Sequence, residues 1–167
     1  MSQVLQKKVC LLGSFAVGKT SLVSRSVKGI FSDKYLSTMG VKIDRKSLQL
    51  DDVTVNMMLW DVHGEESNKK VPAAYMRGSA AYLLVIDGTR IASVDAAREL
   101  HSRMKSEVGD VPFVVLLNKV DLKDEWQLSD TDVTAMKDDG WECYVTSAFS
   151  GENVEEAFSH LALQLIS

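Results

Sequence analysis

The 167-residue sequence has few residues suited to redox chemistry or metal binding, with only two cysteines and three histidines. Cys10 and Cys143 lie in apolar segments typical of strands, so we expect reduced thiols in the core of a cytosolic protein. This placement argues against a disulfide or a metal-binding pair. The histidines lie far apart in the chain and lack the spacing of metal ligands.

Basic charge and long apolar runs are also scarce. The formal net charge is −4 and the pI is near 5.4, which argues against a nucleic-acid partner. No apolar run reaches the roughly 18 residues of a membrane-spanning helix. The first residues contain neither a myristoylation glycine nor a signal-peptide pattern, and the last three include no cysteine for prenylation. We therefore expect a cytoplasmic location and no membrane anchor in this chain.

The most informative stretch is Gly13–Thr20, which matches the phosphate-binding pattern G-x-x-x-x-G-K-[ST]. An apolar run precedes it and a predicted helix over residues 21–28 follows, which is the context this motif requires. Backbone N–H groups of such a loop bind phosphate oxygens, and the positive end of the helix dipole points at the same anion. Lys19 can reach the outer phosphates and the Thr20 hydroxyl can ligate magnesium. The alternative is a plain glycine-containing turn.

Hydrophobic periodicity predicts one α/β domain over residues 1–167 with a mostly parallel sheet. Strands are expected at 8–12, 41–50, 53–60, 80–86, 111–117 and 141–146, and helices at 21–28, 72–77, 92–108, 130–138 and 154–165. The strand at 53–60 should pair antiparallel with 41–50, in which a slip of the apolar phase suggests a bulge at 44–46. Residues 29–40 are predicted as a loop. Asn153 and Glu156 are spaced as a capping box for the last helix.

Ligands bind beyond the carboxyl ends of parallel strands, so polar residues placed just after strands are the candidate site. Asp61 and Gly64 form D-x-x-G, in which the carboxylate can hold magnesium through water and the glycine N–H can approach the last phosphate. An acidic solvated turn is the alternative. In Asn118–Asp121, the Asp121 carboxylate can accept from the N1–H and 2-amino donors of guanine, a pair that adenine lacks. A charged loop is the alternative there.

With these pieces in order, the chain resembles a small GTPase of the Ras superfamily over residues 7–166. The motifs that carry the resemblance are Gly13–Thr20, Thr38, Asp61–Gly64, Asn118–Asp121 and Ser147–Ala148. The resemblance implies a P-loop NTPase three-layer sandwich, with a six-stranded mostly parallel sheet, one antiparallel strand and about five helices. It also implies a monomeric GTP- and GDP-binding switch that uses Mg²⁺.

The resemblance assigns roles to individual residues. The phosphates would be surrounded by Ala16, Val17, Gly18, Lys19, Thr20 and Ser21. Magnesium would be held by Thr20, by Asp61 through water and, in the GTP state, by Thr38. Guanine would contact Phe31, Asn118, Lys119, Asp121, Ser147, Ala148 and Phe149. Residues 32–40 and 62–76 resemble the two switch segments, which contacts to the γ-phosphate order and hydrolysis releases, and through which effectors and regulators would bind.

The resemblance also implies the catalytic residues Lys19, Gly64 and Glu65, but the pattern departs from the family near the γ-phosphate. Phe15 stands where Ras proteins carry glycine, Glu65 replaces the water-orienting glutamine, and His63 replaces a small residue. A bulky Phe15 would crowd an arginine finger, which contributes about 10³–10⁵ in rate. We expect slow hydrolysis and a poor response to finger-type activators. The alternatives are an unaffected enzyme, with these side chains at the surface, and a non-hydrolysing GTP-binding scaffold.

Two further departures leave the branch of the superfamily open. Phe149 replaces a usual lysine after Ser147–Ala148, and Val41–Asp44 lacks the phenylalanine typical of Rab proteins. A divergent or prokaryotic branch without lipid anchoring fits as well as Rab or Ras proper. An ATP-using P-loop enzyme is a further alternative, which Asn118–Asp121 disfavours.

Overall fold

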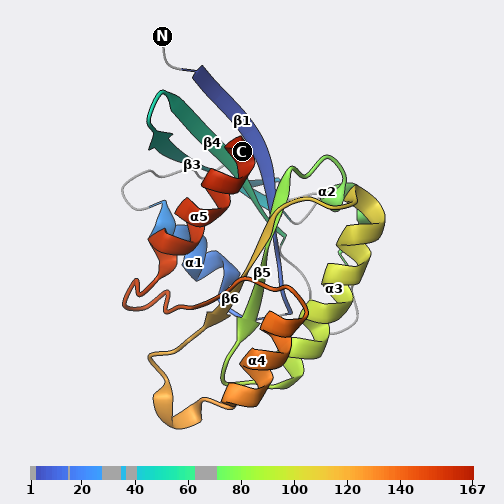
Figure 1. Ribbon diagram of the computed structural model, residues 1–167, viewed down its shortest axis with the longest axis vertical. Helices are drawn as coiled ribbons and strands as arrows, with labels where there is room; N and C mark the ends of the chain where they lie inside the picture. The colour runs from blue at the N-terminus through green and yellow to red at the C-terminus, as the bar shows by residue number, and fades with distance from the viewer. Residues whose placement is uncertain (1–2, 15, 28–34, 37–40, 63–70) are drawn as a thin grey trace.

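The computed structural model describes residues 3–14, 16–27, 35–36, 41–62 and 71–167 (Figure 1). Its strands are β1 (Gln3–Leu12), β2 (Tyr35–Leu36), β3 (Val41–Leu50), β4 (Val53–Val62), β5 (Ala81–Asp87), β6 (Phe113–Asn118) and β7 (Cys143–Val145). Its helices are α1 (Lys19–Ser26), α2 (Ala73–Met76), α3 (Ala92–Val108), the 3-10 helix η1 (Lys123–Glu125), α4 (Asp130–Asp138) and α5 (Val154–Ile166).

All strands join one sheet in the order β2-β3-β4-β1-β5-β6-β7. β1 lies in the middle and pairs parallel with β4 and β5, while β3 runs antiparallel to β4. This confirms the predicted mostly parallel sheet of six strands with one antiparallel strand. β2 is a two-residue addition at the edge of β3, inside the segment that was predicted as a loop.

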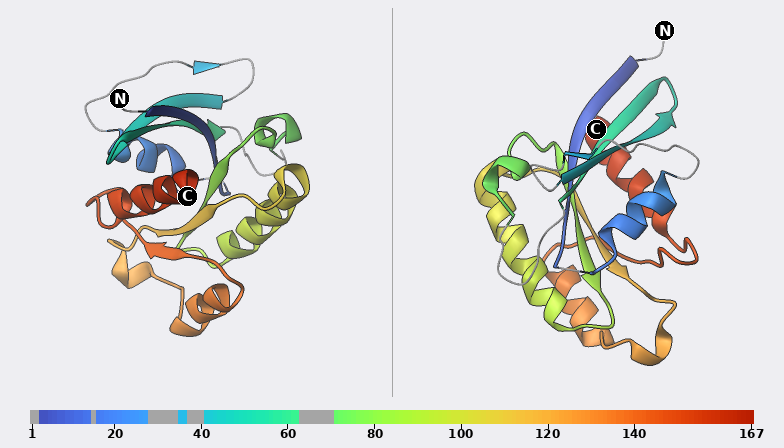
Figure 2. Two further views of the ribbon diagram at one scale, coloured as in Figure 1. Left: turned by 45° about the horizontal axis from the view of Figure 1, so that its top comes forward. Right: turned by 180° about the vertical axis from the view of Figure 1, so that it is seen from behind.

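Helices cover both faces of the sheet, giving three layers (Figures 1 and 2). α1 and α5 pack on one face, where Leu22 and Phe158 belong to the same buried cluster as Val9 of β1. α2, α3 and α4 pack on the other face, together with Cys10 of β1. Every residue of β5 is buried, as expected for a parallel strand between two helical layers.

The two cysteines are free thiols, as predicted. Cys10 is fully buried in β1, and burial raises the pKa of the partly buried Cys143 to about 11. The Cys143 thiol therefore stays protonated at neutral pH, where a thiol is a poor nucleophile. In the part of the chain that the structure describes, no helix has the length and apolar character needed to cross a membrane.

The predicted bulge in β3 is wrong, because the strand pairs with β4 without interruption from Val41 to Leu50. The apolar phase shifts because the two ends of β3 contribute to different cores. Val41 packs in the layer of α2 and α3, whereas Leu48 and Leu50 pack toward α1 and α5. Successive side chains of a strand point to opposite faces of the sheet. A continuous strand can therefore bury an odd-numbered residue at one end on one face and even-numbered residues at the other end on the opposite face, without a bulge.

The predicted capping box at α5 is also wrong. Asn153 lies at the N-cap in the left-handed region, with φ 58°, and its side-chain amide donates to the Val145 carbonyl at 2.8 Å. A capping box instead begins α4, where the Ser129 hydroxyl accepts from Asp132 N–H and the Asp132 carboxylate accepts from Ser129 N–H. Each cap therefore depends on the backbone angles at the helix start.

Lys46 of β3 is a buried cation that links the sheet to both helices of one layer. The residue is 6 % exposed, and its side chain donates to the Ser26 carbonyl at the end of α1, at 2.7 Å. It also pairs with Glu155 at the start of α5, at 2.5 Å. These two partners compensate for burial of the ammonium group, which would be costly alone.

We predict that Lys46→Met destabilises the fold by about 1–3 kcal/mol, because the Ser26 carbonyl loses its partner while the apolar stem is kept. Chemical denaturation measures this difference. Arg45→Met is the matched control on the opposite, exposed side of β3 and should change the free energy of unfolding by less than about 0.5 kcal/mol. Equal stabilities of the two variants would contradict the role assigned to Lys46.

Candidate functional site

The carboxyl ends of β1, β4, β5, β6 and β7 meet at one edge of the sheet, where a cavity of about 690 Å³ opens. The predicted residues follow these strands, as the sequence indicated. Eight of them line the cavity, namely Gly18, Thr20, Ser21, Asn118, Lys119, Asp121, Ala148 and Phe149. Segments that are more than a hundred residues apart in the chain are thus brought together, as the contact between Lys119 and Ala16 shows.

The phosphate-binding motif forms the turn between β1 and α1. Gly18 is the N-cap of α1 with φ 106°, and a Cβ added to it would lie 2.3 Å from the Asn118 side-chain nitrogen. Both observations require glycine at this position. The first turn of α1 carries no acidic side chain, so the positive end of its dipole is not neutralised. Lys19 is almost fully buried and donates from Nζ to the Gly13 carbonyl at 2.9 Å.

Asn118 joins three loops of the site through its side-chain amide. Its Nδ2 donates to the Val17 carbonyl at 3.0 Å, and its Oδ1 accepts from the Thr146 hydroxyl at 3.2 Å and from Ala148 N–H at 3.3 Å. The side chain is 1 % exposed. Its observed role is therefore to fix the loops after β1, β6 and β7 relative to one another, with Ala148 N–H already engaged.

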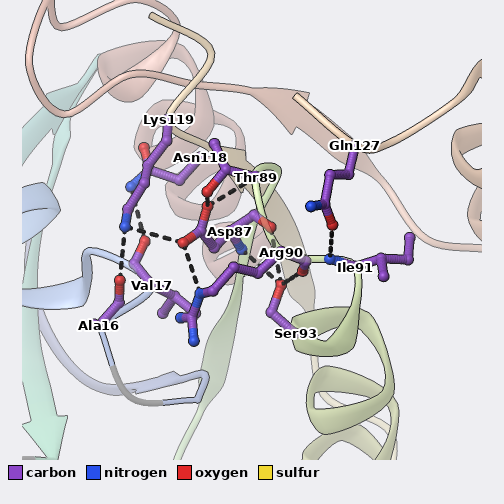
Figure 3. Close-up of polar contacts among 10 residues, drawn as sticks. All are labelled: Ala16, Val17, Asp87, Thr89, Arg90, Ile91, Ser93, Asn118, Lys119 and Gln127. Carbon is purple, nitrogen blue, oxygen red and sulfur yellow. Dashed lines mark hydrogen bonds and ion pairs between the residues drawn. The ribbon is translucent and has the colours of Figure 1, made fainter. Parts of the chain in front are cut away.

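Lys119 connects the phosphate-binding turn to β5, as Figure 3 shows. Its Nζ donates to the Ala16 carbonyl at 2.8 Å and lies 2.9 Å from Oδ2 of Asp87. Asp87 is 1 % exposed and also accepts from Thr89 and Arg90. Burial alone would raise the pKa of Asp87, but hydrogen bonds from Thr89, Lys119 and Arg90 outweigh it and lower that pKa.

Asn118 and Lys119 also orient the backbone of the turn. They bind the carbonyls of Val17 and Ala16, and in a trans peptide the next N–H points the opposite way. The N–H groups of Gly18 and Val17 are therefore directed away from these side chains. Within the described residues neither N–H has a hydrogen-bond partner. Two adjacent oriented donors beside a helix N-terminus can bind an anion.

Thr20 and Asp61 form the candidate metal site. The Thr20 hydroxyl donates to Oδ2 of Asp61 at 2.6 Å, and Asp61 is 1 % exposed. A hydroxyl and a carboxylate are the hard oxygen ligands that magnesium prefers. No group of three or more His, Cys, Asp or Glu side chains suited to a metal occurs among the described residues.

Asp121 is held in orientation by Ser147. The Ser147 hydroxyl donates to Oδ1 of Asp121 at 2.8 Å and accepts from Ser150 N–H at 3.0 Å. Ser147 is fully buried, whereas Asp121 is exposed at the cavity wall. The carboxylate thus keeps a fixed direction while the rest of its acceptor capacity faces the cavity.

Phe149 lines the cavity from the loop after β7 with 83 % of its surface exposed. Its carbonyl accepts from Nη2 of Arg25 in α1 at 2.9 Å. Sequence reasoning missed both Arg25 and Asp87. Asp87 carries the same signal as Asp61 and Asn118, a polar residue that ends a buried strand. Arg25 carries no such signal.

The chain is similar in sequence to known proteins. The family model described as "Ras family" matches residues 8–167. "Ras-related protein Rab-8B" of Homo sapiens is 32% identical over 162 residues, covering 96% of this chain and 78% of the relative. "Ras-related protein RABA1b" of Arabidopsis thaliana is 34% identical over 161 residues, covering 95% and 74%. "Ras-related protein Rab-3D" of Mus musculus is 31% identical over 156 residues, covering 92% and 71%.

The chain belongs to the Ras family. The predicted resemblance to a small GTPase of the Ras superfamily is therefore confirmed. Membership gives this Ras-family protein the general character of a GTP-binding switch. The fold agrees, with a phosphate-binding turn after the central strand of a doubly covered sheet.

Several predicted residues of this Ras-family protein lie outside the described part of the chain. They are Phe15, Phe31, Thr38, His63, Gly64 and Glu65, together with most of residues 32–40 and 62–76. Their assignments to the γ-phosphate, the metal, the base and catalysis stay predictions.

We predict that Asp87→Asn lowers stability by about 1–3 kcal/mol at pH 7, because Lys119 and Arg90 lose a buried anionic partner. The folded-state pKa of Asp87 is lowered, so its contribution is present above the ordinary carboxyl pKa near 3.9 and is lost as the pH falls through the lowered value. Denaturation at pH 7, 4 and 3 should show the difference between wild type and variant shrinking below about pH 4.

The exposed pair of Arg98 and Asp139 supplies the control for this measurement. Asp139→Asn should change stability by less than about 1 kcal/mol at pH 7. A wild-type advantage over Asp87→Asn that stays constant down to pH 3 would show that the charge of Asp87 is not what stabilises the site.

Proposed function

We propose that this protein binds GTP and GDP with Mg²⁺ as a cytoplasmic, monomeric switch and hydrolyses GTP slowly. The observation that carries the proposal is the carboxylate of Asp121, oriented by Ser147 at the wall of the same cavity that holds Gly18 and Thr20. A purine-reading acceptor and a phosphate-binding turn thus face one space of about 690 Å³, within the size range of small-molecule sites.

The phosphate end of the nucleotide would lie against the turn from Ala16 to Thr20. The N–H groups of Val17 and Gly18 would donate to phosphate oxygens, and the buried Lys19 would exchange its bond to the Gly13 carbonyl for a phosphate oxygen. Thr20 and Asp61 would hold Mg²⁺, which supplies positive charge beside the terminal phosphates. Donors fixed before the reaction stabilise developing charge without reorganisation.

The base would lie between the loops after β6 and β7. Asp121 would accept from the N1–H and 2-amino groups of guanine, and Lys119 and Phe149 line the same cavity. An adenine there would leave the carboxylate unpaired, which is how a site built for two donors rejects the analogue. This disfavours the alternative of an ATP-using enzyme.

Slow hydrolysis is proposed from the chemistry of Phe15 and Glu65. A carboxylate at position 65 adds negative charge beside the phosphate and cannot donate to it as the amide of glutamine does. The ring of Phe15 would crowd a partner's arginine. The second candidate function is a GTP-binding scaffold without hydrolysis, which the same two departures from the family pattern favour.

Effectors and regulators would bind through residues 32–40 and 62–76. Two described elements belong to this surface: β2, which pairs at the edge of β3, and α2. Switch segments of this kind become ordered when they contact the γ-phosphate and lose that order after hydrolysis.

We predict that Asp121→Ala lowers the preference for GDP over ADP by about 10²–10⁴, since two hydrogen bonds to a charged acceptor are lost. Competition for a fluorescent guanine nucleotide measures both affinities. Asp124→Ala removes an exposed carboxylate of η1 that does not line the cavity and should leave the preference unchanged. A wild-type protein that binds the two nucleotides equally would overturn the assignment.

We predict that single-turnover GTP hydrolysis is slow in the wild type and faster in Phe15→Gly and in Glu65→Gln. The first change opens room beside the phosphate, and the second restores an amide that can orient water. Phosphate release with saturating GTP and Mg²⁺ measures the rate. Identical rates in all three proteins would contradict the roles of both residues, and no release from any would favour the scaffold.

A further inference from the structure

A second cavity of about 520 Å³ lies between η1, α4 and β7. The apolar part of its wall comes from Val120, Trp126, Leu128, Val133 and Val145. Its volume falls within the range of small-ligand sites in proteins. None of its lining residues also lines the first cavity, so the two are separate.

One short segment divides the two cavities. Lys119, Asp121 and Leu122 line the first cavity, whereas Val120 and Lys123 line the second. The Val120 N–H donates to the Thr146 carbonyl at 3.1 Å, which ties the segment to the end of β7. The second cavity is therefore adjacent to the guanine-reading loop but does not share its lining side chains.

The wall of the second cavity is held in place from outside it. The Trp126 ring lies against Gly88, where an added Cβ would be 2.0 Å from its Cζ3 atom. Gln127 N–H donates to the Gly88 carbonyl at 2.7 Å, and the Gln127 side chain accepts from Ile91 N–H at 2.8 Å. Figure 3 shows Gln127 reaching Ile91 from the loop before α4. The aromatic wall is thus built before any ligand arrives, which reduces the cost of binding.

The charges that line the second cavity favour an anion. Lys123 and Lys137 are exposed, and neither forms an ion pair within the described residues, whereas Asp130 is the one carboxylate in the lining. Two cations and one anion give this lining a net charge of +1 in a chain of net charge −4. Apolar side chains and two ammonium groups in one lining are complementary to a ligand with an apolar body and one anionic group.

We propose that the second cavity binds a small amphiphile with a single carboxylate or sulfonate on an aromatic or aliphatic body. The apolar body would pack against Trp126 and Val133, and the anionic group would lie between Lys123 and Lys137. Binding at this site would not require the nucleotide, although Val120, which lies between Lys119 and Asp121, is part of its wall.

The test uses the fluorescence of 8-anilinonaphthalene-1-sulfonate with the full chain saturated with GDP and Mg²⁺, so that the first cavity is filled. We expect one saturable site. Thr134→Tyr places a ring in the cavity from an exposed position of α4 and should raise the Kd about tenfold or more. Thr131→Tyr, on the same helix but outside the cavity, should leave the Kd within twofold.

The role of charge is tested with the double variant Lys123→Ser and Lys137→Ser. It should raise the Kd of the sulfonate probe about tenfold and change that of neutral N-phenyl-1-naphthylamine less than twofold. Lys105→Ser, an exposed lysine of α3 outside the cavity, is the matched control. Circular dichroism and thermal unfolding confirm that each variant is folded.

Three outcomes would overturn the proposal: no saturable binding by the GDP-saturated wild type, equal Kd values for Thr134→Tyr and Thr131→Tyr, or displacement of the probe when GDP is titrated into protein not yet loaded with it. The last would place the probe in the first cavity. A fluorescent guanine nucleotide detects separately whether GDP binds. Failure of GDP to bind would contradict the proposed function. The second cavity would still be tested by the same variants.

Discussion

The arrangement of the site depends on the buried amide of Asn118. Its nitrogen and oxygen bind groups from the loops after β1 and β7, and the residue itself ends β6. A buried amide that lost these partners would cost the desolvation of each polar atom, so the relative position of the three loops is strongly determined. The same amide lies so close to Gly18 that no side chain fits there. One interaction therefore fixes both the loop geometry and the residue type of the phosphate-binding turn.

The charge of Lys119 is placed by Asp87, which extends this constraint to β5. An isolated buried carboxylate would be protonated or unstable, but four hydrogen-bond donors from Thr89, Arg90 and Lys119 keep Asp87 ionised. Lys119 in turn holds the Ala16 carbonyl. Because a carbonyl and the following N–H point in opposite directions, the side chains that bind the carbonyls of the turn determine where its donors point. The direction of the turn's N–H donors is thus a consequence of residues about a hundred positions away.

Much of this could be predicted from the sequence because the relevant patterns are local. The predicted helices at 92–108, from the spacing of apolar residues, and at 130–138 have the bounds of α3 and α4 as the structure has them. The candidate site followed from a rule of topology, since polar residues that end parallel strands share one edge. Asp61, Asn118 and Asp121 were found in this way.

The errors arise where a residue's environment is set by distant segments. β1 begins at Gln3 rather than at Lys8, because its first residues are exposed and are held only by pairing with β4 from Val53 onward. The apolar pattern of β3 was misread because two cores on opposite faces use the same strand. Asn153 was assigned a capping role by its spacing, but its left-handed backbone turns the side chain toward β7 instead. None of these contacts leaves a periodic signal in the chain.

Asp121 shows why a hydrogen bond that fixes the orientation of a side chain can matter more than burial in a recognition site. An exposed carboxylate gains little from charge alone, since water screens it and its rotamers are free. Ser147 removes that freedom by donating to one oxygen, and Ser147 is itself buried and bound by Ser150 N–H. In the proposed function, discrimination between purines would then depend on the fixed direction of the Asp121 carboxylate as a hydrogen-bond acceptor, and less on the electrostatic attraction of its charge. The conformational cost of orienting it is met by folding and not by the nucleotide.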